Sequence, residues 1–184
     1  MKIGYFITAC NEFEELSRLL LMLKTNITDN DCIGILLDEE NYTPEVQELC
    51  ERFVLPDNSI RIGYAPLNND FATFKNTGYE LLNDCDWIFQ IDADEIPSST
   101  LMGNLHEIIE LNPTIDLIYI PRINTVEGLT QEHIDKWRWQ VNEKGWVNWP
   151  DYQGRIWRNR PNIMWKNKVH EVLTGYKEHT YLPT

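Results

Sequence analysis

Short apolar runs alternate with amphipathic stretches through the first two thirds of the chain. Four runs have the length and β-forming composition of buried strands, and they lie at residues 3–8, 32–37, 87–91 and 117–121. Residues 60–64 alternate apolar and other side chains, as a partly buried strand does. The pattern therefore predicts five strands.

The stretches between these runs carry the repeat of an amphipathic helix, most clearly the leucines of residues 16–23. The expected helix starts are the capping-box-like pair Asn11 and Glu14, Thr43 before Pro44, Asp70, and residues 97–99. Strands that alternate with helices form a mostly parallel sheet with helices on both faces. We therefore expect an α/β, Rossmann-like fold, without the glycine fingerprint of dinucleotide-binding proteins.

Length and charge narrow the classes of function. A chain of 184 residues with 42% hydrophobic residues fits a single compact domain, here 1–184. The formal charge of −13 argues against nucleic acid or an anionic membrane as the main partner. No apolar segment has the length of a membrane span or a signal sequence, so a cytoplasmic protein is the expectation. Four widely spaced cysteines without zinc-site spacing suggest buried, reduced thiols.

Acidic residues follow the predicted strand at 87–91, in the sequence Asp92-Ala93-Asp94-Glu95. The carboxyl ends of strands are where open α/β sheets bind ligands, and alternation lets Asp92 and Asp94 share a side. Two close carboxylates repel each other unless a cation intervenes, and oxygen ligands suit Mg²⁺ or Mn²⁺. The alternative is an acidic turn after a strand, with Asp92 capping it.

The chain resembles GT-A-fold nucleotide-sugar glycosyltransferases, most closely a small member of the inverting family-two type. The likeness rests on four stretches in the family's order: residues 7–12, 70–76, 92–95, and the late pair 153–159 and 169–171. It implies a GT-A fold in which residues 1–121 form the nucleotide-sugar-binding half. Residues 122–184 would form the half that binds the acceptor and completes the metal site.

The resemblance implies which residues contact the donor nucleotide. They would be Thr8, Ala9, Asn11 and Glu12 after the first strand, Asp38 after the second, Lys75, Asp92, Ala93 and Arg155. Several have plain structural alternatives. Asn11 can cap a helix, acidic residues before a helix complement its dipole, and Lys75 can be a solvated helix lysine.

The last third carries the expected catalytic and metal-completing residues. By resemblance, His170 completes a metal site with Asp92 and Asp94, although a lone His is usually structural. Asp151 is the first choice for the general base, with Glu127 and Glu132 in reserve, and its alternative is a turn residue after a proline. Six tryptophans lie here, and they suggest where the acceptor side of the cleft is built, although each one packs well in a core.

These observations lead to one expected function. It is a glycosyltransferase that uses Mn²⁺ or Mg²⁺ and moves a sugar from a UDP-sugar to a hydroxyl of a glycan or small-molecule acceptor. The resemblance alone implies that the transfer inverts the configuration of the sugar. A nucleotidyltransferase shares the layers and carboxylates but needs a glycine-rich phosphate loop, and none is visible near residue 10. A non-catalytic nucleotide- or glycan-binding module is the third possibility.

Overall fold

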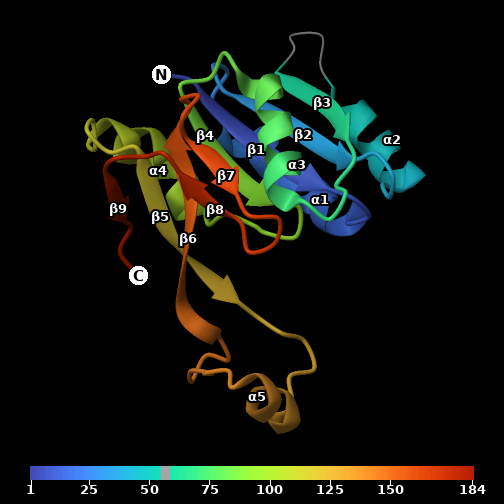
Figure 1. Ribbon diagram of the computed structural model, residues 1–184, viewed down its shortest axis with the longest axis vertical. Coiled ribbons are helices and arrows are strands. Elements are labelled where there is room, and N and C mark those ends of the chain that lie inside the picture. The colour runs from blue at the N-terminus through green and yellow to red at the C-terminus, as the bar shows by residue number, and fades with distance from the viewer. Residues whose placement is uncertain (55–58) are drawn as a thin grey trace.

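The computed structural model describes residues 1–54 and 59–184, which form a three-layer α/β structure (Figure 1). Strands and helices alternate from the N-terminus as the periodicity predicts. The first elements are β1 (Ile3–Ala9), α1 (Phe13–Asn26), β2 (Cys32–Asp38), α2 (Pro44–Phe53), β3 (Ile60–Ala65), α3 (Phe71–Thr77), η1 (Gly78–Leu82) and β4 (Trp87–Asp92). The later ones are α4 (Ser99–Glu110), β5 (Leu117–Asn124), α5 (Gln131–Trp137), β6 (Val147–Arg158), β7 (Met164–Lys166), β8 (Val172–Thr174) and β9 (His179–Tyr181).

The main sheet has the strand order β3-β2-β1-β4-β6-β5-β9. The first four strands are parallel, β6 is antiparallel to both of its neighbours, and β9 runs parallel to β5. The expectation of a mostly parallel sheet is therefore confirmed. The insertion of β6 between β4 and β5 was not predicted, because pairing between distant strands leaves no local pattern.

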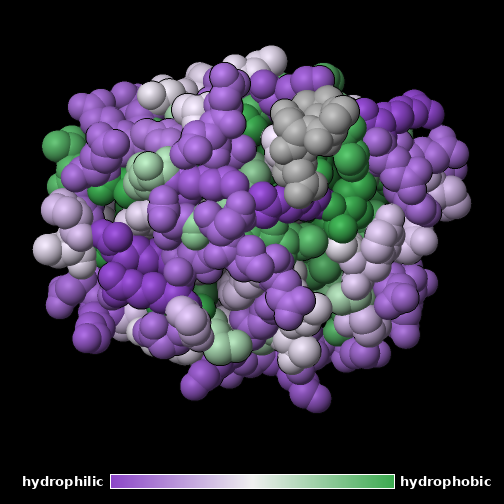
Figure 2. Space-filling view, turned by 90° about the horizontal axis from the view of Figure 1, so that it is seen from above, coloured by the Kyte–Doolittle hydropathy of each residue, from purple (hydrophilic) through white to green (hydrophobic). Residues whose placement is uncertain are grey.

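Two apolar clusters cover the two faces of this sheet. On one face, Leu16, Leu20, Val46 and Leu105 place α1, α2 and α4 against the strands. The other face packs against α3, η1 and the β7–β8 hairpin. Figure 2 shows the molecule from above, where the surface is mostly hydrophilic with a hydrophobic patch near its middle. None of the helices in the described residues is long and apolar enough to cross a membrane.

Three local predictions need correction. The helix after β1 begins at Phe13 with Glu12 as its cap residue, so the capping box expected at Asn11 and Glu14 does not form. The helix that Asp70 starts, with its side chain accepting from Thr73 N, changes at Gly78 into a 3-10 turn. Asp151 lies within β6 and is not a turn residue before that strand.

The long strands β5 and β6 leave the body of the molecule and carry α5 at their far end (Figure 1). None of the residues of α5 is buried, although its capping box with Thr130 is complete. Near the body, the pairing passes from Ile118↔Ile156 to Tyr119↔Gly154, so Arg155 is the extra residue of a β-bulge. Bulges redirect side chains, and Arg155 is the residue that reaches the acidic cluster described below.

Candidate active site

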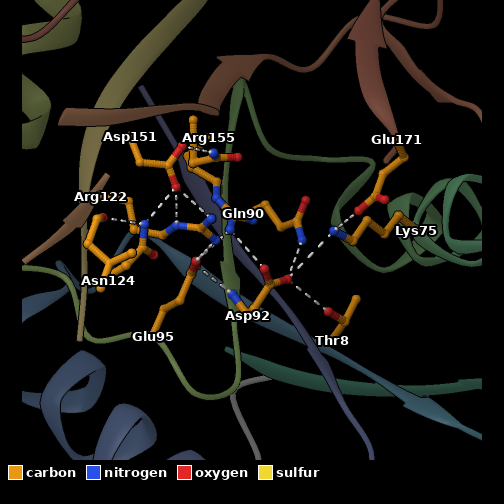
Figure 3. Close-up of polar contacts among 12 residues, drawn as sticks. Thr8, Lys75, Gln90, Asp92, Glu95, Arg122, Asn124, Asp151, Arg155 and Glu171 are labelled. Carbon is orange, nitrogen blue, oxygen red and sulfur yellow. Dashed lines mark hydrogen bonds and ion pairs between the residues drawn. The ribbon is translucent and has the colours of Figure 1, made fainter. Parts of the chain in front are cut away.

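Asp92 is the last residue of β4, and four side chains hold its carboxylate at the carboxyl edge of the sheet (Figure 3). One oxygen accepts from the Gln90 amide at 2.9 Å and from Thr8 Oγ1 at 3.4 Å, and it lies 3.6 Å from Lys75 Nζ. The other oxygen accepts from Arg155 at 2.8 Å. Asp92 thus joins β1, α3 and β6, which are far apart in the sequence.

Two more carboxylates, Glu95 and Asp151, lie beside Asp92, and Glu95 shares Arg155 with Asp92 (Figure 3). Glu95 accepts from Arg155 at 2.5 Å and from Arg122 at 3.1 Å. Arg122 also donates to one oxygen of Asp151 through two nitrogens, at 2.7 and 3.0 Å. Each arginine therefore bridges two acidic groups, and the site is a continuous network of opposite charges.

Lys75 connects this network to the C-terminal part of the chain, at Trp165 and Glu171. Its side chain is almost fully buried, and its ammonium donates to Glu171 at 2.7 Å and lies 4.9 Å from the centre of the Trp165 ring. The alternative of a solvated helix lysine is therefore wrong for Lys75. A buried ammonium between two carboxylates is a fixed positive charge.

The charges around Asp92 shift its titration. Burial alone raises the pKa of a carboxyl group, but the positive charges of Arg155 and Lys75 outweigh it and lower the pKa of Asp92 to about 2. An unfolded Asp has a pKa of about 3.9. Since the folded pKa is the lower one, Asp92 contributes stability above about pH 4, and that stability is lost as the pH falls towards about 2.

This pKa shift predicts how the loss of folding stability caused by Asp92→Asn depends on pH. The urea midpoint of the variant should lie below that of the wild type at pH 6, and the gap should shrink as the pH falls from about 4 to about 2. Urea titrations at pH 2 to 6 measure the gap. Asp94→Asn, which also removes one negative charge, is the control. A gap for Asp92→Asn that stays constant over this range would contradict the ion pairing.

Asp94 differs from its neighbours. Because β4 ends at Asp92, the alternation of a strand does not extend to Asp94, and the backbone turns so that Glu95 N donates to Asp92 O at 2.9 Å. The Asp94 carboxylate is exposed, lines the cavity described below, and makes no polar contact with the described residues. It is therefore free to bind a ligand.

These positions test how well a divalent ion fits. Mg²⁺ and Mn²⁺ sites often use one or two carboxylates and substrate phosphates, and Asp94 offers such a carboxylate. The oxygens of Asp92 already face two cations. His170 is exposed, and among the described residues Asp92, Asp94 and His170 do not converge into one group of potential ligands. The residues fit an ion held by Asp94 together with a phosphate, and the three-residue site stays a prediction.

The residues expected to contact the nucleotide gather at the ends of β1 and β2. Thr8 is paired in register with Asp92, and Ala9 is buried beside it. The Glu12 carboxylate accepts from the backbone N–H groups of Cys10 and Asn11 at 2.7 and 3.0 Å. Glu12 thus fixes the turn itself.

Asp38 is nearly buried, and its contacts are structural. It accepts from Leu67 N at 3.1 Å and from the Asn41 side chain at 2.7 Å. These bonds tie together the loops that follow β2 and β3. Any contact between Asp38 and a base or ribose would therefore compete with the Asn41 amide or use a remaining lone pair.

A cavity of about 1240 Å³ opens next to the carboxylates, between α4 and the β5–β6 strands. Asp92, Asp94, Glu95, Asp151 and Arg155 line one end of it. Most of the other lining is apolar, and it includes Trp139 and Trp149. Of the remaining late tryptophans, Trp157 and Trp165 are buried in the core, so only part of the predicted tryptophan cluster faces the cleft.

Arg122, Glu95, Gln90 and Asn124 were not among the predicted site residues. The alternation of apolar and polar side chains in residues 121–124 would have placed Arg122 and Asn124 on one face of a strand. Arg158 belongs to the same strand as Arg155, but it donates to the backbone oxygens of Ile115 and Pro113 and does not contact the acidic residues of the site. Glu127 and Glu132 are exposed near α5 and do not line the cavity.

No protein-family model and no curated protein matches this chain. Among solved structures, residues 1–349 of TarS from S. aureus bound to UDP superpose with a TM-score of 0.58, at 13% identity over 71% of this chain and 38% of that one. The complex with UDP-GlcNAc gives a TM-score of 0.54, at 14% identity over 71% of this chain and 36% of that one. This chain thus spans less than two fifths of that TarS fragment. The likeness confirms the expected GT-A-like, Rossmann-like fold.

Proposed function

We propose that this protein is a metal-dependent, inverting glycosyltransferase that moves a sugar from a UDP-sugar to an acceptor hydroxyl. The observation that carries the proposal is the setting of Asp92 and Asp94. They lie at the carboxyl edge of a GT-A-like sheet, where α/β folds bind ligands, and they border a cavity of about 1240 Å³. The UDP and UDP-GlcNAc complexes of TarS, which shares the fold, support UDP as the nucleotide to test.

In this proposal the donor nucleotide lies over the ends of β1 and β2. Thr8, Ala9, Asn11, Glu12 and Asp38 surround that edge, and Ala93 continues it after Asp92. Ala9 and Ala93 are almost fully buried, so in this proposal they lie beneath the donor and shape the floor of the edge. Asp92 orients the donor through whichever lone pairs Thr8, Gln90 and Arg155 leave available.

The leaving diphosphate needs positive charge. The cluster holds five carboxylates, from Asp92, Asp94, Glu95, Asp151 and Glu171, against three cations, from Lys75, Arg122 and Arg155. Mn²⁺ or Mg²⁺ held by Asp94, with Asp92 and His170 as further predicted ligands, would neutralise the diphosphate as a Lewis acid. Lys75 and Arg155 supply fixed charges beside it.

We assign the general base to Asp151. Asp151 lines the cavity, on the side where we place the acceptor. Its carboxylate accepts hydrogen bonds from Arg122, Asn124 and Gln153. The apolar and aromatic lining beyond it suits the C–H faces of a sugar ring or a small acceptor. A single carboxylate that removes the hydroxyl proton during attack gives inversion by direct displacement.

Calorimetric titration of UDP with and without Mn²⁺ tests the metal–nucleotide site. Wild-type protein should bind UDP more tightly with Mn²⁺, by about tenfold or more, which corresponds to about 1.4 kcal/mol or more. Asp94→Asn should lose this increase, because the structure leaves Asp94 as the free carboxylate. Asp70→Asn, which keeps an oxygen for the cap of α3, is the control for one lost charge at the same sheet edge.

Other outcomes separate the remaining functions. UDP binding that needs Mn²⁺, without release of UDP from any UDP-sugar, would identify a non-catalytic binding module. Release of pyrophosphate from a nucleoside triphosphate would identify a nucleotidyltransferase. No UDP binding under any condition would contradict the proposal as a whole.

A further inference from the structure

Two cysteines meet at the end of the sheet opposite to the candidate active site. Cys32 is the first residue of β2, and Cys85 lies two residues before β4; β1 runs between β2 and β4 in the sheet (Figure 1). Their sulfur atoms are 3.0 Å apart, and both residues are buried. A disulfide bond of about 2.05 Å needs the sulfurs to approach by only about 1 Å.

The intervening strand makes room for this pair. Gly4 of β1 lies opposite Cys32 in the sheet register. A Cβ atom at Gly4 would lie 3.0 Å from the Cys85 sulfur, which is tighter than ordinary contact. The absence of a side chain at Gly4 therefore allows Cys85 to reach over β1 to Cys32.

Positive charges lie beside the two thiols. Asp84 is held by Arg61 through two bonds of 2.6 and 2.9 Å and by Lys2 at 2.6 Å. The two sulfurs share a hydrogen bond in which either thiol can be the donor, and the Cys85 thiol also donates to Asp84 at 3.9 Å. The bond with Cys85, followed by the charges of Arg61 and Lys2, lowers the pKa of Cys32. The bond with Cys32 and burial raise the pKa of Cys85, so Cys32 is the better thiolate.

Access also distinguishes the two residues. A small cavity of about 180 Å³ is lined by Cys32 together with Lys2, Asp31 and Arg61. Cys85 does not line it. A small oxidant in this cavity lies on the Cys32 side of the pair, and both residues are buried, with Cys32 1% and Cys85 5% exposed.

We propose that Cys32 and Cys85 form a peroxide-oxidisable dithiol that closes to an intramolecular disulfide. The Cys32 thiolate attacks one oxygen of hydrogen peroxide, the O–O bond breaks, and with one proton taken up the products are a Cys32 sulfenic acid and water. Cys85 then attacks the Cys32 sulfur, an S–S bond forms, and a second water leaves with the Cys85 proton. In total, two thiols are oxidised by two electrons, and one peroxide becomes two waters.

A metal site is the rival interpretation of the same residues. Ligand atoms of Cys32, Asp84 and Cys85 lie within 4.8 Å of one another, which is compatible with zinc. However, Arg61 engages both Asp84 oxygens, and Lys2 adds a contact to one of them. A metal would have to displace these cations, whereas the disulfide leaves them in place.

Peroxide treatment of the folded protein tests the proposal in a Cys10→Ser background, because Cys10 is the cysteine that is not fully buried. We expect the mass to fall by two hydrogens, two free thiols to disappear, and one peptide pair linking Cys32 to Cys85. Dithiothreitol should reverse all three changes. The bond closes a loop of more than 50 residues, and it should raise the melting temperature by roughly 10 °C.

Single variants test the order of the steps. Cys85→Ser should accumulate a Cys32 sulfenic acid that dimedone captures, whereas Cys32→Ser should leave Cys85 unmodified. Cys50→Ser, which removes a buried cysteine of α2, should behave like the parent protein. The proposal is overturned if the parent keeps both thiols, or if Cys32 over-oxidises without a crosslink. It is also overturned if the purified protein holds one zinc per chain that Cys85→Ser loses.

Discussion

Asp151→Asn should lower the turnover of sugar transfer by about 10² to 10⁴, the usual contribution of a general base. Burial raises the pKa of Asp151, but its bonds with Asn124, Arg122 and Gln153 outweigh burial and lower it, so the group is ionised at neutral pH. An amide of the same shape keeps the hydrogen bond from Arg122 but cannot take a proton. UDP affinity should stay unchanged, because Asp151 lies on the acceptor side.

The measurement is UDP release at saturating donor, with a donor sugar identified by screening. Glu127→Gln is the matched control, since Glu127 is exposed, does not line the cavity and was the first reserve candidate. Melting temperatures of both variants show whether a lost rate reflects a lost fold. Full turnover in Asp151→Asn together with a slow Glu127→Gln would move the base to Glu127.

Arg155→Met should destabilise the folded protein by about 3–5 kcal/mol, the usual cost of removing one partner from a buried ion pair. Arg155 is only 5% exposed, and it contacts both Asp92 and Glu95. Methionine replaces the aliphatic part of the arginine side chain and carries no charge, so the variant removes the cation while keeping the apolar packing of the side chain. The carboxylates of Asp92 and Glu95, which are partly buried, then lose the cation that they share.

Urea unfolding at neutral pH measures this loss through the midpoint and the slope. Arg52→Met is the control, because Arg52 makes an exposed pair with Glu48 on α2, and such pairs contribute about 1 kcal/mol or less. A loss for Arg155→Met as small as that of Arg52→Met would show that Asp92 and Glu95 remain well solvated. The site's charge network would then not depend on burial.

Local sequence patterns predicted most of the elements. The strands β1 to β5 and the helices α1 to α4 follow from apolar runs, helical periodicity and turn residues, which are properties of neighbouring positions. Asp92 and Asp94 were found because they follow an apolar strand directly. The same pattern did not show that β4 ends at Asp92, and so it did not show that the two carboxylates have different surroundings.

The rest of the site depends on pairing between distant segments. Arg155 reaches Asp92 because β6 pairs with β4 in the antiparallel direction and bulges at that residue. Glu171 reaches Lys75 across 96 positions. The sequence carries no local signal for either contact, so a resemblance to a known family was needed to suggest Arg155, and Arg122 was missed.

The strand order has a consequence for how the molecule folds during synthesis. The strands β3, β2, β1 and β4 come first in the chain and can pair as soon as they leave the ribosome, but β4 and β5 cannot be joined until β6 arrives between them. Until then the edge of β4 that later pairs with β6 has unpaired backbone N–H and C=O groups, and such edges can pair with other chains. The contacts of Asp92 with Arg155 and of Lys75 with Glu171 close only afterwards. The charged network is therefore assembled among the last parts of the molecule, and an interrupted chain would present an exposed strand edge in its place.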